Sequence, residues 1–558
     1  MGGRLADSFS SFDDDLLLPI LPLSDLQGPS ATLQPVPENK HRPELNASLS
    51  LINRDSSTAF ALGEDKSREL LDLIDSDVFK FTRDNEQGPF TEQAQRLFLA
   101  GYRQDEDHPL SRNMMQTYLL SYWENFSDQL PILHRPTFNA DTAPVILLVA
   151  MIAIGAATSN AKSSGRYNRA TTAGMCLPNY LAWGVKWEMF RDRNFRAPAS
   201  LWALQVLILL ETYEALYSNG DLHERAVIYH PSTVQLVRWG RSLVGTAGDS
   251  NLWPSPSAAA PPETGDAADG WWHRWITTEA TRRLAFSSFV VDSMHSTIFG
   301  NSSIMTFHEV GIPLPCDDEL WNATSGAEVR QSMARSMAAG AKQITFLEAL
   351  KNTVAGQSVQ TGSDFGRRIL LAGLLNVSFH GNRGDLQDRA IGNIDGTGVG
   401  GGKLRPDMAK AIDSWKRNSE HACLPGRRAE EDSNIAFLHQ FAHMAIHTDF
   451  PECQIFAGAK PFFMGRNVDA ATRLGKESKM KWWAGSAKGR DAAFHALCLL
   501  RSVLVPEASG TGKSHGLRPR LIYSVKTDTL IYRPWVVYLS ALVVWSYGRM
   551  RSLSKGRR

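Results

Sequence analysis

The stretch between Trp271 and Trp321 constrains the fold most, because its first half has the pattern of one long helix. Apolar residues recur there at intervals of three, four or seven positions, which stacks them along one helical face. They are Trp272, Ile276, Ala280, Leu284, Val291, Met294 and Ile298. The run stops at Gly300. We expect the rest of the chain to be organised around this helix, since an amphipathic helix gains most of its stability by packing.

Polar residues of the same stretch predict local contacts. Glu279 lies three and four residues before Arg282 and Arg283, the spacing at which opposite charges meet on a helix. Thr306 and Glu309 have the spacing of a capping box, which predicts a second, short helix just beyond the first.

Similar helical patterns recur along the chain and predict an all-α protein. The ranges are 111–126, with Ser111 as a helix cap, then 145–157, 201–217, 221–238, 325–380 and the chain beyond Pro406. The two most apolar runs, residues 145–157 and 535–545, are shorter than the roughly 20 residues that span a bilayer. We therefore expect no membrane partner.

Composition divides the chain into regions. Residues 1–65 are rich in proline and polar residues, so we predict a disordered, acidic segment. Residues 66–110 are predicted to hold short helices and a linker, and residues 111–549 a single large helical domain. Glycines near 390–403 predict a flexible insert, and residues 550–558 form a basic tail.

The amino-terminal region contains one segment in which a block of acidic residues lies between aromatic and leucine residues. Its members are Phe9, Phe12, Asp13, Asp14, Asp15, Leu16 and Leu17. Acidic neighbours keep such side chains solvated until a partner groove accepts them. An ordinary acidic linker has the same composition, so both interpretations stay open.

The five cysteines are isolated from one another. Without a CxxC pair, neither a C2H2 zinc finger nor a six-cysteine cluster can be assembled from this sequence. Cys316 is followed by Asp317 and Asp318, whose charges would raise the pKa of the thiol rather than activate it. We predict no catalytic, cofactor-binding or DNA-binding residues in this chain.

Three histidines, His439, His443 and His447, lie four residues apart. Histidines at this spacing on one helix can share a metal ion. The first and third would lie about 12 Å apart, however, given the rise of a helix. One ion could then reach two of them at most, so we expect no metal site and no stoichiometric zinc.

A further set of residues carries a family resemblance. They are His134 and Arg135 in a proline-bracketed turn, Glu279 with Arg282 and Arg283, then Asp292, Pro315, Cys316 and Trp321. With these residues the chain resembles the fungal-specific transcription factor domain, over roughly residues 111–549. The likeness is greatest to the subgroup with amino-terminal C2H2 zinc fingers. We expect His134 and Arg135 to anchor their turn beside an aromatic cluster.

The resemblance implies a regulator of RNA polymerase II genes in a fungal nucleus, tied to a metabolic gene cluster. It also implies transcription co-regulators as partners, a homo- or heterodimer, and an activating role for the acidic segment. DNA would be contacted through a zinc-finger region that this sequence lacks, or through another protein. A truncated gene model and a natural regulator without fingers both fit. The net charge of +1 gives no whole-chain attraction to nucleic acid.

The alternative hypothesis comes from another class of protein. An enzyme or ligand-binding protein could retain the same helical domain and line a pocket with its tryptophans, of which the chain has fifteen.

Overall fold

The structure is a computed structural model, and all of its named elements are helices. It describes residues 61–77, 102–106, 108–159, 173–218, 220–240, 266–338, 343–359, 361–390, 401–421, 429–458, 470–505 and 530–555, with Phe79, Tyr523, Val525 and Asp528. Within these ranges no β-strand is present, and the prediction of an all-α fold is confirmed. No helix in them combines the length and hydrophobicity needed to cross a membrane.

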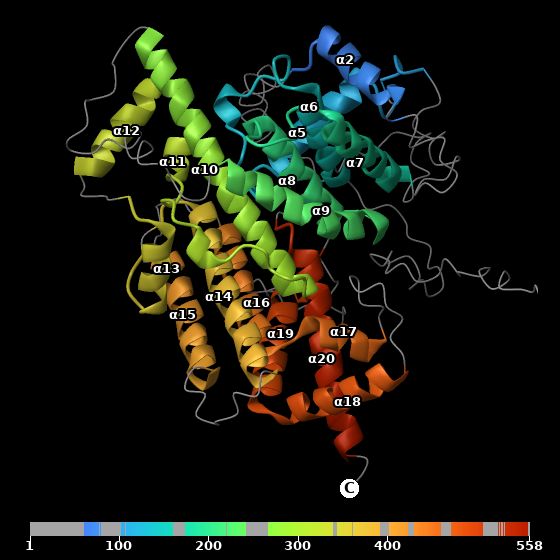
Figure 1. Cartoon of the computed structure of the whole chain (residues 1–558), viewed down its shortest axis with the longest axis vertical. Coiled ribbons are helices and arrows are strands. Elements are labelled where there is room, and N and C mark those ends of the chain that lie inside the picture. The colour runs from blue at the N-terminus through green and yellow to red at the C-terminus, as the bar shows by residue number, and fades with distance from the viewer. Residues whose placement is uncertain are drawn as a thin grey trace, which may run out of the picture.

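The long helix predicted from the sequence is α10 (Asp266–Phe299), and it runs between two groups of helices (Figure 1). Gly300 ends it with a positive φ of 76°, a conformation that glycine adopts without steric cost. The predicted amphipathic pattern holds only for the first half. From Arg283 to Ser296 every residue is buried, on all sides of the helix. The sequence pattern could not show this, because the burial comes from neighbours on both sides.

The first group of helices packs against one side of α10. Its members are α2 (Glu64–Ile74), α5 (Arg112–Asn125), α6 (Val145–Thr158), α7 (Ala173–Arg191), α8 (Leu201–Leu216) and α9 (Gly220–Trp239). Ser111 caps α5 as predicted, since its side chain accepts a hydrogen bond from the backbone N–H of Met114. Helices α5, α6, α8 and α9 match the predicted ranges to within one residue at each end.

The second group contains the carboxyl-terminal helices. Its members are α13 (Phe346–Val354), α14 (Asp364–Ala390), α15 (Gly401–His421), α16 (Ala429–His447), α17 (Phe450–Ala457), α18 (Ala470–Gly485), α19 (Ala487–Leu504) and α20 (Arg533–Lys555). Two small helices, α11 (Asp318–Trp321) and α12 (Gly326–Ala338), lie near the start of α10. The predicted capping box of Thr306 and Glu309 is present at the 3-10 helix Phe307–Glu309.

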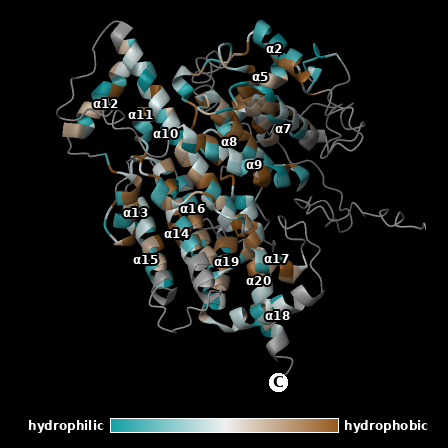
Figure 2. Ribbon diagram, viewed as in Figure 1, coloured by the Kyte–Doolittle hydropathy of each residue, from teal (hydrophilic) through white to brown (hydrophobic). Residues whose placement is uncertain are grey.

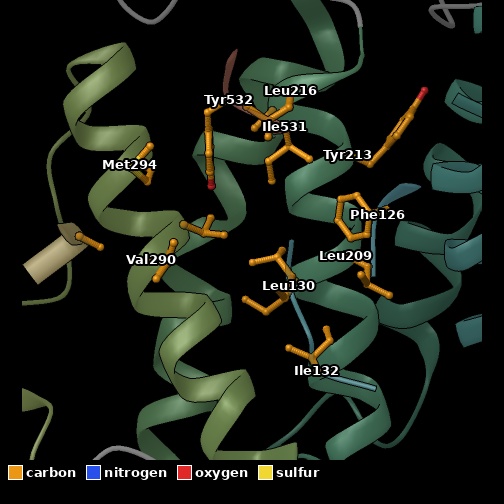
Figure 3. Packing of buried hydrophobic residues seen from close by; sticks show 14 of the residues in the cluster. Phe126, Leu130, Ile132, Leu209, Tyr213, Leu216, Val290, Met294, Ile531 and Tyr532 are labelled. Carbon is orange, nitrogen blue, oxygen red and sulfur yellow. The ribbon is translucent and has the colours of Figure 1, made fainter. Parts of the chain in front are cut away.

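One hydrophobic core joins the two groups, and its residues are spread over both of them (Figure 2). Figure 3 shows the junction, where side chains come from the turn after α5, from α8, from α10 and from the residues just before α20. They include Phe126, Leu130, Ile132, Leu209, Tyr213, Leu216, Val290, Met294, Ile531 and Tyr532.

Two predicted boundaries change. Helix α15 already begins at Gly401, so the last two glycines of the predicted insert are helical. Helix α20 continues to Lys555, so most of the predicted basic tail extends a helix instead of forming a separate tail. The acidic segment at residues 9–17 lies outside the described residues.

Replacing Leu284 with Ala is expected to lower the free energy of unfolding by about 2–5 kcal/mol, because a buried leucine leaves a cavity. The Leu284 side chain is 0% exposed at the centre of α10. Denaturant unfolding measures the change. Leu497→Ala is the matched control, since that leucine is 54% exposed on α19 and should cost less than about 0.5 kcal/mol. Equal losses for the two variants would contradict the central position of α10.

Candidate functional site

The fully buried half of α10 carries polar residues, and each needs a partner inside the protein. Arg283 forms the first of two polar clusters. Its Nε lies 3.0 Å from Oε1 of Glu279, and its Nη2 donates to the backbone oxygen of Cys316 at 2.8 Å. The Cys316 N–H donates to the same Glu279 oxygen at 3.0 Å. The guanidinium also lies 4.4 Å from the ring centre of Trp321, a cation–π contact.

This group, called here the Arg283 cluster (His134, Glu279, Arg283, Cys316 and Trp321), confirms the ion pairs predicted from spacing. Arg282 pairs with the other oxygen of Glu279 at 2.6 Å. Pro315 is buried next to Cys316. The pKa of the Cys316 thiol is well above its usual value because the group is buried, and next because of Glu279. The direction was predicted, but the main cause is burial and not the aspartates that follow.

His134 brings the preceding turn to this cluster. Its ring meets Trp321 edge to face at 4.8 Å and Trp272 at 5.5 Å between ring centres, so the predicted aromatic neighbours are confirmed. Its Nδ1 hydrogen-bonds the hydroxyl of Thr137 at 2.8 Å. Burial lowers the pKa of His134 to about 4, so the ring is neutral near pH 7. Arg135, beside it, is exposed to solvent.

Asp292 is the centre of the second cluster, one that fixes the loop after α10. Its carboxylate accepts hydrogen bonds from Ser303 Oγ at 2.6 Å and from the backbone N–H groups of Ile304 and Met305, each at 3.0 Å. His230 of α9 lies 2.8 Å away through Nε2. Hydrogen bonds and charge from His230, together with those from the loop, lower the pKa of Asp292 despite its burial.

His230 lies between two buried carboxylates. Its Nδ1 pairs with Glu211 of α8, on the side opposite Asp292. Burial alone would lower the pKa of His230, but Glu211 and Asp292 raise it to about 10. The ring is therefore an imidazolium near pH 7. We call this group the Asp292 cluster (Glu211, His230, Asp292, Ser303 and Asn376). Within it, the positive charge of His230 on α9 pairs with the carboxylates of Glu211 on α8 and Asp292 on α10, and so holds the three helices together.

Asn376 extends the cluster to α14. Its side-chain N–H₂ donates to the backbone oxygen of Met305 at 3.0 Å, and its oxygen accepts from the N–H of Phe307 at 3.0 Å. Arg238 of α9 holds the same loop through Glu309 at 2.7 Å and the Ile304 oxygen at 2.8 Å. The loop after α10 thus links helices of both groups.

Sequence reasoning singled out Asp292 but missed Glu211, His230 and Asn376. His230 and Asp292 are 62 residues apart, and Asn376 lies 71 residues from Met305. No local spacing connects such positions. In both clusters a buried carboxylate is paired with a buried cation. Such ion pairs are suited to fixing the relative positions of helices.

The buried tryptophans among the described residues fall into two separate hydrophobic clusters. Those near α12 are Trp271, Trp272, Trp275 and Trp321, whereas those buried in the main core are Trp123, Trp415 and Trp483. They pack as core residues in both places. These tryptophans do not line one common pocket, so they give no support to the hypothesis of a tryptophan-lined pocket.

A third polar cluster lies away from α10. His439 and His443 of α16 both approach Asp413 of α15. Two of the three histidines predicted to share a helix thus gain a carboxylate from a different helix. These are the described residues whose positions fit a metal ion.

Sequence comparison decides the family. The profile of the fungal specific transcription factor domain matches residues 119–422, more than half of the chain. The chain belongs to this family. The match covers α10, the Arg283 cluster and the Asp292 cluster. The resemblance predicted from the sequence motifs is confirmed.

Several curated relatives share this fungal-specific transcription factor domain. Zinc finger protein klf1 of Schizosaccharomyces pombe is 26% identical over 448 residues, which cover 79% of this chain and 52% of the relative. Zinc finger protein zas1 of the same yeast is 26% identical over 458 residues, 78% of this chain and 45% of the relative. The chain spans about half the length of these relatives.

Another relative is named for a pathway. The nicotinate catabolism cluster-specific transcription factor of Emericella nidulans is 24% identical over 461 residues, 79% of this chain and 48% of the relative. No solved structure matches the chain. The family and these relatives place the chain among transcription regulators.

Proposed function

We propose that this chain is the regulatory domain of a pathway-specific fungal transcription regulator that acts in the nucleus on genes of a metabolic cluster. The observation that carries the proposal is the family match over residues 119–422. A relative named for a nicotinate catabolism cluster supports the pathway-specific role.

In this proposal, DNA contact comes from a zinc-finger region outside residues 1–558 or from a partner protein. Two features of the sequence support it: the five cysteines form no CxxC pair, and the net charge is +1. Specific recognition needs a rigid element with side chains held at base edges, and small zinc modules need their metal ligands to fold. Co-regulators and a second regulator subunit are the partners that fit this role.

The domain regulates by holding or releasing an activation surface. The acidic segment with Phe12, Leu16 and Leu17 supplies that surface, because leucine and aromatic side chains among acidic residues suit a partner's apolar groove. Helix α10 supports such control, since the Asp292 cluster connects α8 and α9 of the first group to α14 of the second. A shift at the Asp292 cluster would therefore move helices of both groups together.

Tethering the full chain to a heterologous DNA-binding domain is expected to change transcription of a reporter several-fold, whereas the untethered chain leaves the reporter unchanged. Replacing Phe12, Leu16 and Leu17 with Ala in the tethered chain should remove most of any activation, because the groove-binding side chains are lost. Reporter transcript level is the measurement, at matched protein levels.

The matched control is Leu23, Leu26 and Leu33 to Ala, three leucines of the same region outside the acidic segment. That variant should keep the full reporter response. An intact tethered chain without effect in either direction would refute the regulatory role. Equal losses in the two triple variants would instead assign the acidic segment to a linker.

A further inference from the structure

We propose that Asp413, His439 and His443 form a binding site for a divalent transition-metal ion, with Zn²⁺ the best match. The site joins α15 to α16, outside the Arg283 and Asp292 clusters. It goes beyond the regulatory role proposed above and does not depend on it.

The three side chains converge on one point. Oδ1 of Asp413 lies 2.9 Å from Nε2 of His439 and 2.9 Å from Nε2 of His443, and the three ligand atoms lie within 4.8 Å of one another. Bonds to Zn²⁺ of about 2.0–2.2 Å place tetrahedral ligand atoms about 3.3 Å apart. A small rotation of the Asp413 side chain, which is 56% exposed, would widen the spacing and convert the hydrogen-bonded cluster into a coordinated one.

The spacing of histidines along the sequence predicted no metal site because the third ligand, Asp413, comes from a different helix. His447, one turn further along α16, was too distant to serve with both other histidines. Packing of α15 against α16 instead brings in Asp413, which lies 26 residues before His439. Two imidazoles at i and i+4 with one carboxylate form a nitrogen and oxygen set that suits Zn²⁺.

The chemistry of the three side chains also suits a metal. Neutral imidazole and ionised carboxylate are the forms that bind metal. On coordination through Nε2, each neutral ring carries its proton on Nδ1.

The surroundings leave one side open to solvent. The histidines are 8% and 6% exposed, whereas the Asp413 side chain is 56% exposed, so an ion can enter past the carboxylate. The His495 ring of α19 stacks on His443 at 4.5 Å between ring centres, and its Nδ1 bonds Gln440 at 2.7 Å. A water molecule would complete a tetrahedral site on the open side.

The test uses the purified full chain after treatment with a chelator and dialysis. Titration with Zn²⁺, followed by a competing chromophoric chelator, is expected to give one ion per chain and a higher midpoint of thermal unfolding, because the ion binds only the folded arrangement. Co²⁺ in place of Zn²⁺ should give the intense visible absorption of a four-coordinate site.

Asp413→Asn and His443→Gln should each weaken Zn²⁺ binding more than about tenfold, at least the loss seen for supporting residues of metal sites. His447→Gln on the same helix is the matched control and should bind as the parent chain does. Circular dichroism checks that the variants fold, and the exposure of Asp413 makes the first of them structurally mild.

Two outcomes would overturn the site. The first is a chain that binds no Zn²⁺ and shows no rise in its unfolding midpoint, which would leave a hydrogen-bonded cluster only. The second is equal Zn²⁺ binding by the parent chain, Asp413→Asn and His443→Gln, which would place the ion elsewhere. The Co²⁺ absorption is measured on the parent chain. It therefore tests for a four-coordinate site even if one of the variants fails to fold.

Discussion

Replacing Arg283 with Met is expected to lower the free energy of unfolding by about 3–5 kcal/mol, the usual cost of removing one partner of a buried ion pair. The Arg283 side chain is 0% exposed, and that of Glu279 is 3% exposed. The variant leaves Oε1 of Glu279 without its charged partner in the core. It also removes the hydrogen bond to the Cys316 backbone and the contact with Trp321. Urea unfolding at constant pH measures the loss.

The matched control is Arg335→Met. Arg335 pairs with Glu319 on the surface, where both side chains are about two-thirds exposed, and such pairs contribute at most about 1 kcal/mol. A double variant, Glu279→Gln with Arg283→Met, should cost less than the sum of the two single variants, because each single variant already breaks the same ion pair. If Arg283→Met costs no more than Arg335→Met, the buried pair does not hold the cluster together.

The stability of the protein is expected to fall when the pH decreases from about 6.5 toward 4. Burial lowers the pKa of His134 and His223 to about 4 and that of His295 to about 3, from an ordinary value of 6.5. Between those values the unfolded chain binds more protons than the folded one, so acid favours unfolding. Each fully shifted group adds at most about 1.4 kcal/mol per pH unit.

His230 has the opposite effect on the alkaline side. Because its folded pKa is raised to about 10, its contribution is complete below 6.5 and is lost as the pH rises toward 10. Stability should therefore be highest between these two limbs. Urea midpoints from pH 4 to 10 measure the profile.

One substitution isolates the acid limb. His295→Gln should reduce the dependence of the unfolding free energy on pH below 6.5 by up to about 1.4 kcal/mol per pH unit, which corresponds to one proton. His273→Gln, at a solvent-exposed position of the same helix, is the control and should leave the slope as it is. A flat profile between pH 4 and 6.5 would contradict the neutral, buried state of these histidines.

The sequence was informative where contacts are local. Glu279 and Arg283 are one helical turn apart, and the capping box of Thr306 and Glu309 spans three residues, so spacing alone predicted both. The end of α10 was equally clear, since Gly300 adopts a conformation that suits glycine. Short-range geometry is fixed by the helix itself.

The sequence was uninformative where partners come from other helices. One face of α10 was predicted to be buried, but residues 283–296 are covered on every side by two groups of helices. His230 reaches Asp292, and Asp413 reaches His439, only because separate helices pack together. The sequence pattern of one helix cannot show which residue of another helix will pack against it.

Burial of the second half of α10 on every side has a consequence during synthesis on the ribosome. The Phe299 ring at its end is covered by Trp535, with ring centres 5.0 Å apart, and Trp535 is translated more than 200 residues later. Until then part of the apolar surface of α10 is exposed to solvent, and this segment of the nascent chain is prone to aggregation. Chaperones that bind emerging polypeptides are therefore expected to protect this helix until Trp535 has been made.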